Sequence, residues 1–319
     1  MNKKPFHNMP PKRGTKRNSK DKGKKEEEPP QKKNKGNEEQ KKDVTTSETK
    51  STSQDKPTVL EKGHIYFLYR PKMDTEGVSN VDDVQKVYTV LKPYWSSCKP
   101  KRENTLIVLG KKKLPETQRH SRYWGFVAEA SDNIDDVAGA FKEHSYETKT
   151  RGERTVQPAR PVGEGVYEIA THNGHSHLAY MLTLPDKPQD VQKAFNIQEQ
   201  ASIVISVKNP DSSAPAQAGL PKRQKAEFPD ELKELFENRR FVDMATTTEF
   251  LNYSNCELML VGATEKIETE LGNAGKELEK MEKEDEEHVD YVGADQSVFD
   301  ELELSKKENP IEPLKGEWT

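Results

Sequence analysis

The sequence predicts an α+β fold with a mainly antiparallel sheet at its core, a few helices, and an unfolded charged segment at each end. Between residues 58 and 264 the apolar residues come in short runs bounded by Gly, Pro or charged residues, which is typical of antiparallel strands. Over the whole chain 33% of residues are charged against 31% apolar, and the charged residues dominate both ends. We therefore expect a disordered basic arm at 1–57, a globular α+β core at 58–264, and an acidic helix with a disordered tail at 265–319.

The first half of the core, residues 60–145, is expected to hold four strands and one helix. The run from Gly63 to Arg70 is aromatic and β-branched and is stopped by Pro71, so it predicts a strand. Three further short apolar runs predict strands at 87–91, 105–109 and 123–127. Asn133 then stands where a helix N-cap belongs, because the apolar residues after it recur at helical spacing: Ile134, Val137, Ala138 and Phe141.

The second half of the core, residues 163–264, has a similar character. It predicts strands at 165–170, 177–184, 202–207 and 258–261, with helices at 189–195 and from Pro229 onward. The first strands of the two halves begin alike, at Gly63 and at Gly165. The tetrapeptide Asp-Val-Gln-Lys, however, precedes the second strand at 83–86 and follows it at 190–193, so the sequence leaves open whether the halves are a true repeat.

The two ends of the chain carry opposite charge. Residues 1–57 hold 17 Lys and Arg against 9 Asp and Glu, whereas residues 265–319 hold 18 Asp and Glu against 7 Lys. In the acidic segment, one narrow helical stripe is formed by Ile267, Leu271, Leu278 and Met281. We interpret it as a frayed or partner-binding helix, and the alternation of acidic and apolar residues at 298–304 as a tail that orders on binding.

The basic arm is the strongest functional signal. Residues 1–25 contain 10 basic residues and one acidic residue. A flexible polycation gains affinity for nucleic acid by releasing condensed counterions, and it needs no fold to do so. The alternative is a solubilising tail that binds nothing specific. The candidate nucleic-acid-binding residues are Lys12, Arg13, Lys16, Arg17, Lys20, Lys22, Lys24 and Lys25.

A second candidate lies in the segment from 146 to 160, which is predicted to be a polar loop. Its basic residues could hold a phosphate or a carboxylate, with Gly152 allowing a turn between them. The alternative is a solvated connector whose charges pair with neighbouring glutamates. The candidate anion-binding residues are Lys149, Arg151, Arg154 and Arg160.

Two further clusters have weaker signals. An aromatic and basic patch suited to stacking on a ring is formed by Arg119, Arg122, Tyr123 and Trp124, and the alternative is a pair of core anchors at a strand start. His172, His175 and His177 flank Asn173-Gly174, a strong hairpin turn signal. No fourth ligand can be named from spacing, so we interpret them as surface histidines beside a turn and predict no metal site.

Several classes of function find no support. The sequence has no P-loop, no complete dinucleotide fingerprint and no nucleophile elbow, so we predict no cofactor. It has no run of about 18 apolar residues, and no apolar stretch follows the basic N-terminus, so we expect no membrane partner. Cys98 and Cys256 are expected to be reduced thiols. We place the protein in the nucleus of a eukaryote, or otherwise in the cytoplasm or nucleoid.

The core also resembles a group of bacterial and fungal proteins. The resemblance covers most of residues 60–263 and is carried by the segments 61–72, 122–127, 146–154, 163–167 and 176–180. Fungal members of that group are often labelled BTB-domain transcription factor. A BTB domain is largely helical, whereas the apolar runs here are bounded like strands, so the resemblance does not imply that fold.

These observations favour a non-enzymatic nuclear or nucleoid accessory protein. In this hypothesis the basic arm binds nucleic acid without sequence preference, and the acidic arm binds a basic protein such as a histone or folds back on the basic arm. A different hypothesis is an enzyme or binding module for a phosphorylated or nucleotide-like ligand. It would use Lys149, Arg151 and Arg154 as an anion clamp and His177 as an acid or base.

Overall fold

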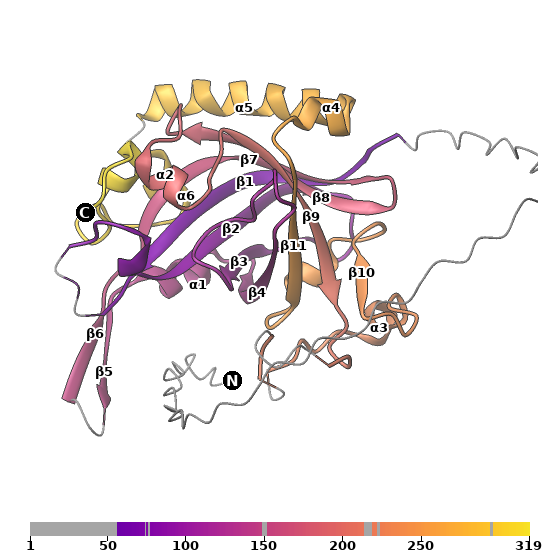
Figure 1. The fold of residues 1–319 in the computed structure, drawn as a ribbon, viewed down its shortest axis with the longest axis horizontal. Coiled ribbons are helices and arrows are strands. Elements are labelled where there is room, and N and C mark those ends of the chain that lie inside the picture. Colours follow the sequence, from indigo (N-terminus) through magenta and orange to yellow (C-terminus); the bar gives the residue numbers. More distant parts are fainter. Residues whose placement is uncertain are drawn as a thin grey trace, which may run out of the picture. The chain divides into compact units, whose positions relative to one another are not determined.

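The computed structural model describes residues 56–73, 75, 77–148, 152–213, 219–221, 224–293 and 296–319 (Figure 1). By its contacts the chain divides into two units, Met1–Lys50 and Ser51–Thr319. All described residues belong to the second unit, so the eight candidate residues of the basic arm lie outside the described residues.

The core of this unit is an antiparallel sheet that closes on itself. Eight strands follow one another around it in the order β1, β2, β3, β4, β11, β9, β8, β7, and β7 pairs back with β1. A short ninth strand, β10 (Phe241–Asp243), extends the edge of β9. The closed strands are β1 (Thr58–Pro71), β2 (Val84–Ser96), β3 (Asn104–Leu109), β4 (Arg122–Ser131), β7 (Arg160–His172), β8 (His175–Leu184), β9 (Gln200–Lys208) and β11 (Glu257–Thr264).

The alternation of side chains along the strands fills the inside of this sheet. In β1, Ile65, Phe67 and Tyr69 belong to the largest hydrophobic cluster, while Tyr66 and Leu68 belong to a second cluster on the outside. One space inside the sheet, lined by residues such as Ile65 and Tyr180, has a volume of about 10 Å³. That volume is about one water probe, so the interior is a packed core and not a ligand cavity.

Four of the helices pack on the outside of the sheet. The longest, α5 (Asn273–Val292), lies across β7 and β8 together with α4 (Ile267–Leu271) (Figure 1). The others are α1 (Ile134–Ala138), α2 (Asp190–Ala194), α3 (Asp230–Glu234) and α6 (Ser297–Glu301), with short 3-10 turns at Val81–Asp83, Gly139–Phe141, Glu249–Asn252 and Glu312–Lys315. The four on the outside are α1, α4, α5 and α6, whereas the buried residues of α2 and α3 join the inner cluster.

The predicted fold class is confirmed. The antiparallel sheet forms the core, and each predicted strand is present, usually longer at its ends than the apolar run that predicted it. Residues from the predicted halves contribute one run of four neighbouring strands each, β1 to β4 and β7, β8, β9 and β11. The two runs join at β1–β7 and at β4–β11, so the halves share one core. Whether they are a true repeat stays a prediction.

Two local predictions differ from the structure. The segment predicted as a loop at 146–160 instead contains a two-stranded hairpin, β5 (His144–Thr148) and β6 (Gly152–Val156), because Tyr146 and Arg154 face each other across a regular ladder. The tail predicted to be disordered also packs against the core. Val298, Phe299 and Leu302 are buried in the outer cluster with Leu314, since the outward face of β1 offers them Tyr66 and Leu68.

Among the described residues, no helix is long and apolar enough to cross a membrane.

Candidate functional site

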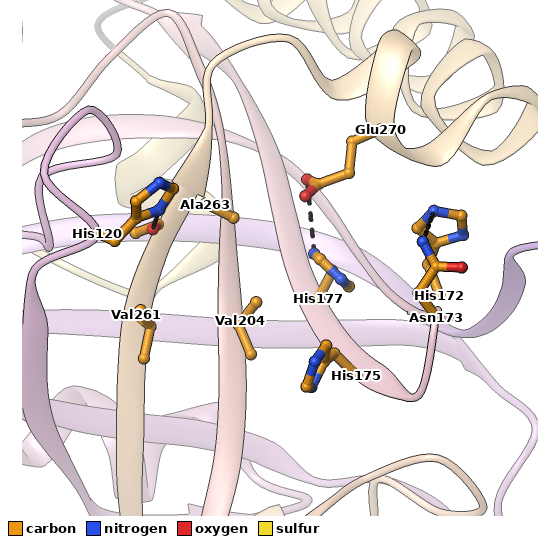
Figure 2. Close-up of a pocket in the computed structure, with 10 residues that line it drawn as sticks. His120, His172, Asn173, His175, His177, Val204, Val261, Ala263 and Glu270 are labelled. Carbon is orange, nitrogen blue, oxygen red and sulfur yellow. Dashed lines mark hydrogen bonds and ion pairs between the residues drawn. The ribbon is translucent and has the colours of Figure 1, made fainter. Parts of the chain in front are cut away.

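A hollow lies on the outside of the sheet, beside the turn between β7 and β8. It has a volume of about 350 Å³ and a rim rich in imidazole (Figure 2). We call it the histidine hollow. Its lining residues are His120, His172, Asn173, His175, His177, Val204, Val261, Gly262, Ala263 and Glu270.

The β7–β8 turn places three of the histidines. Asn173 and Gly174 both have positive φ, as the predicted two-residue hairpin turn requires. His172 then pairs with His175 across the ladder. His175 and His177 lie two residues apart on β8 and share its outward face, while Leu178 points into the core.

Glu270 comes from α4, far away in sequence, and reaches His177 from above in Figure 2. Its carboxylate oxygen Oε2 lies 3.5 Å from Nδ1 of His177, and Ser202 Oγ lies 3.0 Å from the same nitrogen. Burial opposes ionisation of Glu270, but the polar contacts with His177 and Ser202 hold the pKa of its carboxyl below its usual value. The hollow therefore has one fixed negative charge beside its imidazoles.

This Ser-His-Glu group does not have the geometry of a nucleophilic triad. In a triad the acid holds one ring nitrogen of the histidine and the nucleophile faces the other. Here Ser202 and Glu270 both face Nδ1 of His177, and Ser202 is fully buried. Ser202 and Glu270 thus orient the ring, and any ligand in the hollow would have to meet Nε2.

The imidazoles also do not converge on one point. Nδ1 of His120 lies 2.9 Å from the carbonyl oxygen of Gly262, and Nε2 of His172 lies 2.8 Å from the side-chain amide of Asn173. Within the described part of the chain, no three His, Cys, Asp or Glu side chains are grouped so that they could hold a metal ion. The hollow is therefore suited to hydrogen bonding with a small polar molecule.

The candidate anion-binding residues are not seen as one clamp. Lys149 and Arg151 lie outside the described residues. Arg154 lies on β6 of the hairpin, whereas Arg160 begins β7 and is 9% exposed, with its guanidinium bound to Thr319 and Gln157. No residue of the hairpin lines the histidine hollow. Of the loop residues in that hypothesis, the described Arg154 does not line the hollow with His177, and a composite site of the loop with His177 stays a prediction.

The predicted aromatic and basic patch is divided between two faces of β4. Arg122 and Trp124 share one face, where the Trp124 ring packs 6.0 Å from the ring of Phe241, and Tyr123 points to the other. Arg119 precedes the strand and pairs with Glu116 at 3.4 Å. The neighbouring His120, which we had not selected from the sequence, is the residue of this segment that reaches the hollow.

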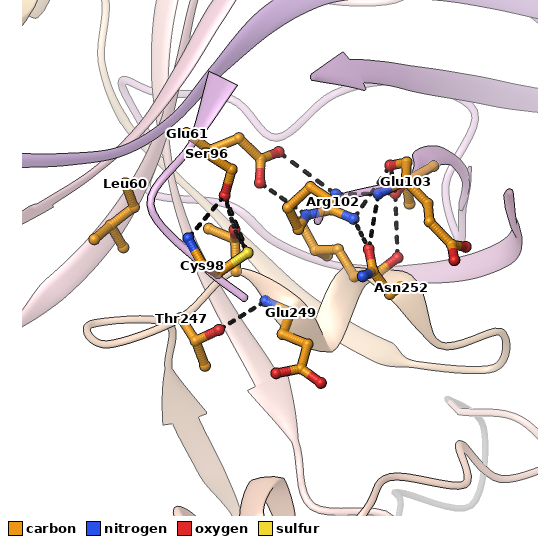
Figure 3. Close-up of polar contacts among 12 residues, drawn as sticks. Leu60, Glu61, Ser96, Cys98, Arg102, Glu103, Thr247, Glu249 and Asn252 are labelled. Atoms are coloured by element: carbon orange, nitrogen blue, oxygen red, sulfur yellow. Dashed lines mark hydrogen bonds and ion pairs between the residues drawn. The ribbon is translucent and has the colours of Figure 1, made fainter. Parts of the chain in front are cut away.

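A second polar cluster lies inside the sheet beside the loop between β2 and β3 (Figure 3). Arg102, 2% exposed, donates to Glu61 at 2.8 Å, and Tyr167 donates to the same carboxylate at 2.6 Å. Arg102 also donates to Thr105 at 3.0 Å and to Asn252. Because the buried charges satisfy one another, removing one partner would leave an uncompensated buried charge, and the cluster offers little to a ligand.

The cysteines lie near this cluster and are both free. Sγ of Cys98 lies 3.0 Å from Ser96 Oγ (Figure 3). Burial raises the pKa of the Cys256 thiol well above its usual value, so this thiol is not poised as a nucleophile.

A third polar cluster lies between the sheet and the helices α5 and α6. Glu164 and Glu168 point outward from β7 and are buried, and burial raises the pKa of Glu164 to about 7 and that of Glu168 to about 8. Ser297 donates to Glu164 at 2.6 Å, but neither carboxylate oxygen of Glu168 has a hydrogen-bond partner among the described residues. Asp285 of α5 faces His64 at 3.1 Å.

The chain matches no family model, no curated protein and no solved structure.

Proposed function

We propose that the protein is a non-enzymatic accessory protein that binds nucleic acid through its basic arm and presents an acidic surface to a basic partner. The observation that carries the proposal is the charge of residues 1–25, with 10 basic residues and one acidic residue. Such a segment neutralises phosphates and releases counterions without reading sequence. The arm has one aromatic residue in that stretch, Phe6, so base stacking contributes little.

The acidic surface in this proposal is the outer face of α5. Leu278, Met281 and Val289 are buried against the sheet, which turns the charged side of the helix outward. Glu284, Glu287 and Asp290 are exposed on that side. A helix docked by its apolar face presents these carboxylates as a fixed row, to which a basic protein such as a histone can bind electrostatically.

The experiment is a binding titration of the full chain with labelled duplex DNA and with single-stranded RNA, followed by fluorescence anisotropy. One variant replaces Lys12, Arg13, Lys16 and Arg17 with Gln. The matched control replaces four exposed core lysines with Gln, which makes the same change in net charge: Lys99, Lys101, Lys111 and Lys142.

The proposal expects both nucleic acids to bind in low salt, the arm variant to lose most of its affinity, and the control to keep most of it. An equal loss in the two variants would mean that total charge matters and the arm does not. Absence of binding by the unaltered chain in dilute buffer would remove the proposal.

A second candidate function is binding of a small polar ligand in the histidine hollow. One observation favours it: Nδ1 of His172 is buried without a hydrogen-bond partner among the described residues, although its ring lines the hollow. A ligand could supply the missing hydrogen bond to Nδ1 of His172 and could also contact Nε2 of His177 beside the Glu270 carboxylate.

Thermal unfolding in the presence of nucleotides, amines and small alcohols tests this second function. A ligand of the hollow raises the melting temperature of the full chain but not that of a His177→Gln variant, and His144→Gln on the exposed hairpin serves as the control. A ligand that stabilises all three proteins equally binds somewhere else.

A further inference from the structure

Residues 311–319 pack against β1, β7 and α2 at the place where Trp318 meets the inner hydrophobic cluster, and we call this place the notch. After the 3-10 turn Glu312–Lys315, the chain passes α2, and Trp318 and Thr319 lie against residues of the sheet. We call residues 311–319 the C-terminal segment. Side chains and single hydrogen bonds hold this segment, and among the described residues it pairs with no strand.

Trp318 is the anchor of the segment. Its ring centroid lies 5.5 Å from that of Phe195 and 6.0 Å from that of Tyr69, the latter in edge-on geometry. Both partners are fully buried, whereas Trp318 itself is only partly buried. The notch therefore offers two aromatic faces to a planar apolar side chain.

Thr319 is held through its oxygen atoms. The backbone N–H of Val78 donates to its carbonyl oxygen at 2.5 Å, and Arg160 donates to the same oxygen and to the hydroxyl, at 2.6 Å for the latter. The Arg160 guanidinium also lies over the Tyr69 ring, with 6.0 Å from its central carbon to the ring centroid. One arginine thus joins the oxygen-binding and the aromatic parts of the notch.

The path of the segment into the notch is fixed by α2. The side-chain amide of Gln192, which is fully buried, donates to Pro313 and to Val162, both at 2.8 Å. Gly316 has a φ of +86° and passes so close to Gln189 that a Cβ would meet the Gln189 side chain at 2.2 Å. Only glycine allows this approach, so the segment is fitted to the notch at both ends.

An empty notch would be unfavourable. If the segment left, the almost buried Arg160 would lose its two oxygen ligands, and its Nε already has no partner among the described residues. Tyr69 and Phe195 would meet water as well. Arg160 would keep only Gln157 as an acceptor for its guanidinium, and this loss and the exposed aromatic rings both favour a replacement ligand.

We propose that this notch is a peptide-binding site, which the C-terminal segment occupies as a tethered ligand and which accepts a peptide from another chain when the segment detaches. The peptide it fits carries an aromatic side chain, best an indole, followed immediately by a residue whose carbonyl or carboxylate oxygen binds Val78 and Arg160. The tether competes at a high effective concentration, so the site opens to partners only when the segment is displaced.

The first experiment uses a fluorescent peptide with the sequence of residues 311–319. A full chain with Trp318→Ser and Thr319→Gly vacates the notch and is expected to bind the peptide saturably. The unaltered chain should bind the peptide at least about 100-fold more weakly, because its own tethered segment competes for the notch. Adding Arg160→Gln to the vacated chain should weaken binding at least tenfold, as should an alanine at the tryptophan position of the peptide.

Equal binding by the vacated and unaltered chains would show that the peptide sits outside the notch, and no binding by a cooperatively folded vacated chain would overturn the proposal. A second measurement decides the matter if the vacated chain does not fold. The sequence has three tryptophans, so Trp95→Phe and Trp124→Phe leave Trp318 as the only one.

In that variant the emission of Trp318 reports its own position. Titration with the 311–319 peptide carrying Phe in place of Trp should shift the emission to longer wavelength as Trp318 moves into water. The same peptide with Ala at that position is the control and should leave the spectrum unchanged. A spectrum that stays constant to millimolar peptide would overturn the proposal.

Discussion

The two charged segments at the ends of the chain differ in what their apolar residues allow. Residues 1–57 have four apolar side chains, none of them in a helical stripe, whereas residues 265–319 carry Ile267, Leu271, Leu278 and Met281 on one face of α4 and α5. That face covers Val166, Ala170 and Ala179 on the outside of the sheet. A strongly acidic segment can therefore be part of a fold when its few apolar residues form a stripe that packs against an apolar surface.

The comparison also separates two kinds of electrostatic role. In the acidic segment some carboxylates face inward toward the sheet and others form the outer row, so its charge is partly structural. The basic arm has no such apolar side to dock, and the proposed function assigns its charge entirely to binding.

Leu278→Ala should produce the largest loss of stability. Leu278 is fully buried in α5, and removing it leaves a cavity above β7 and β8 that costs about 2 to 5 kcal/mol. Urea unfolding gives the free energy, and hydrogen exchange of α5 shows whether the helix loosens first. Tyr291→Ala, at an 89% exposed position on the same helix, should change the stability little. Similar effects of the two substitutions would mean that α5 is not docked by its apolar stripe.

Glu168→Gln should change how stability depends on pH. Burial raises the pKa of folded Glu168 to about 8, above the value in the unfolded chain, so its contribution is fully present below the unfolded pKa and is lost as the pH rises to 8. Gln cannot ionise, so the Glu168→Gln variant does not lose this stability as the pH rises. It should match the unaltered protein near pH 5 and exceed its stability at pH 9 by about 3 to 4 kcal/mol.

Two features make this pH experiment specific. The charged groups that face Glu168 are Lys62 on β1 and Glu277 on α5, which bind each other at 2.7 Å, so neither cancels the buried carboxylate directly. Exposed Glu231→Gln on α3 is the control and should follow the unaltered protein at every pH. If the stability of Glu168→Gln also follows that of the unaltered protein from pH 5 to 9, ionisation of Glu168 does not weaken the docking of α5.

Neutralising the outer row of α5 should have a small effect on nucleic-acid binding. Glu284→Gln, Glu287→Gln and Asp290→Asn together remove three negative charges that oppose binding of a polyanion, so affinity at low salt should rise about two- to fivefold. The matched variant changes the exposed Glu227, Glu231 and Glu234 to Gln. A larger gain in affinity in the α5 variant would indicate that the outer row itself competes with nucleic acid. Equal gains in the two variants would mean that only the net charge of the protein matters.

The strands and the turn were predictable because their signals are local. Asn173-Gly174 and the short apolar runs report the hairpin and the strands within a few residues. The docking of α5 was not predictable from the sequence. Its apolar stripe is narrow, and the surface it packs on comes from β7 and β8, about a hundred residues earlier. The charged and polar sequence at 144–156, which has few apolar residues, likewise hid the β5–β6 ladder.

The histidine hollow was half predictable. His172, His175 and His177 could be selected because they adjoin a turn, but Glu270 lies 93 residues after His177 and sits in a stretch where glutamate is common. No local signal distinguishes Glu270 from its acidic neighbours. The partner of Arg160 was hidden because it too lies far away in sequence. The sequence indicated that Arg160 binds an anion, whereas in the structure its guanidinium donates to Thr319.

The most direct test of the central claim is the salt dependence of nucleic-acid binding by the full chain. Plotting log K against log salt concentration should give a steep negative slope, about −0.9 for each phosphate neutralised on duplex DNA. Replacing Lys12, Arg13, Lys16 and Arg17 with Gln should flatten that slope by about 3 to 4, while the four core lysine substitutions leave it nearly unchanged. A slope near zero, or the same slope in the arm variant, would contradict the assignment of binding to the basic arm.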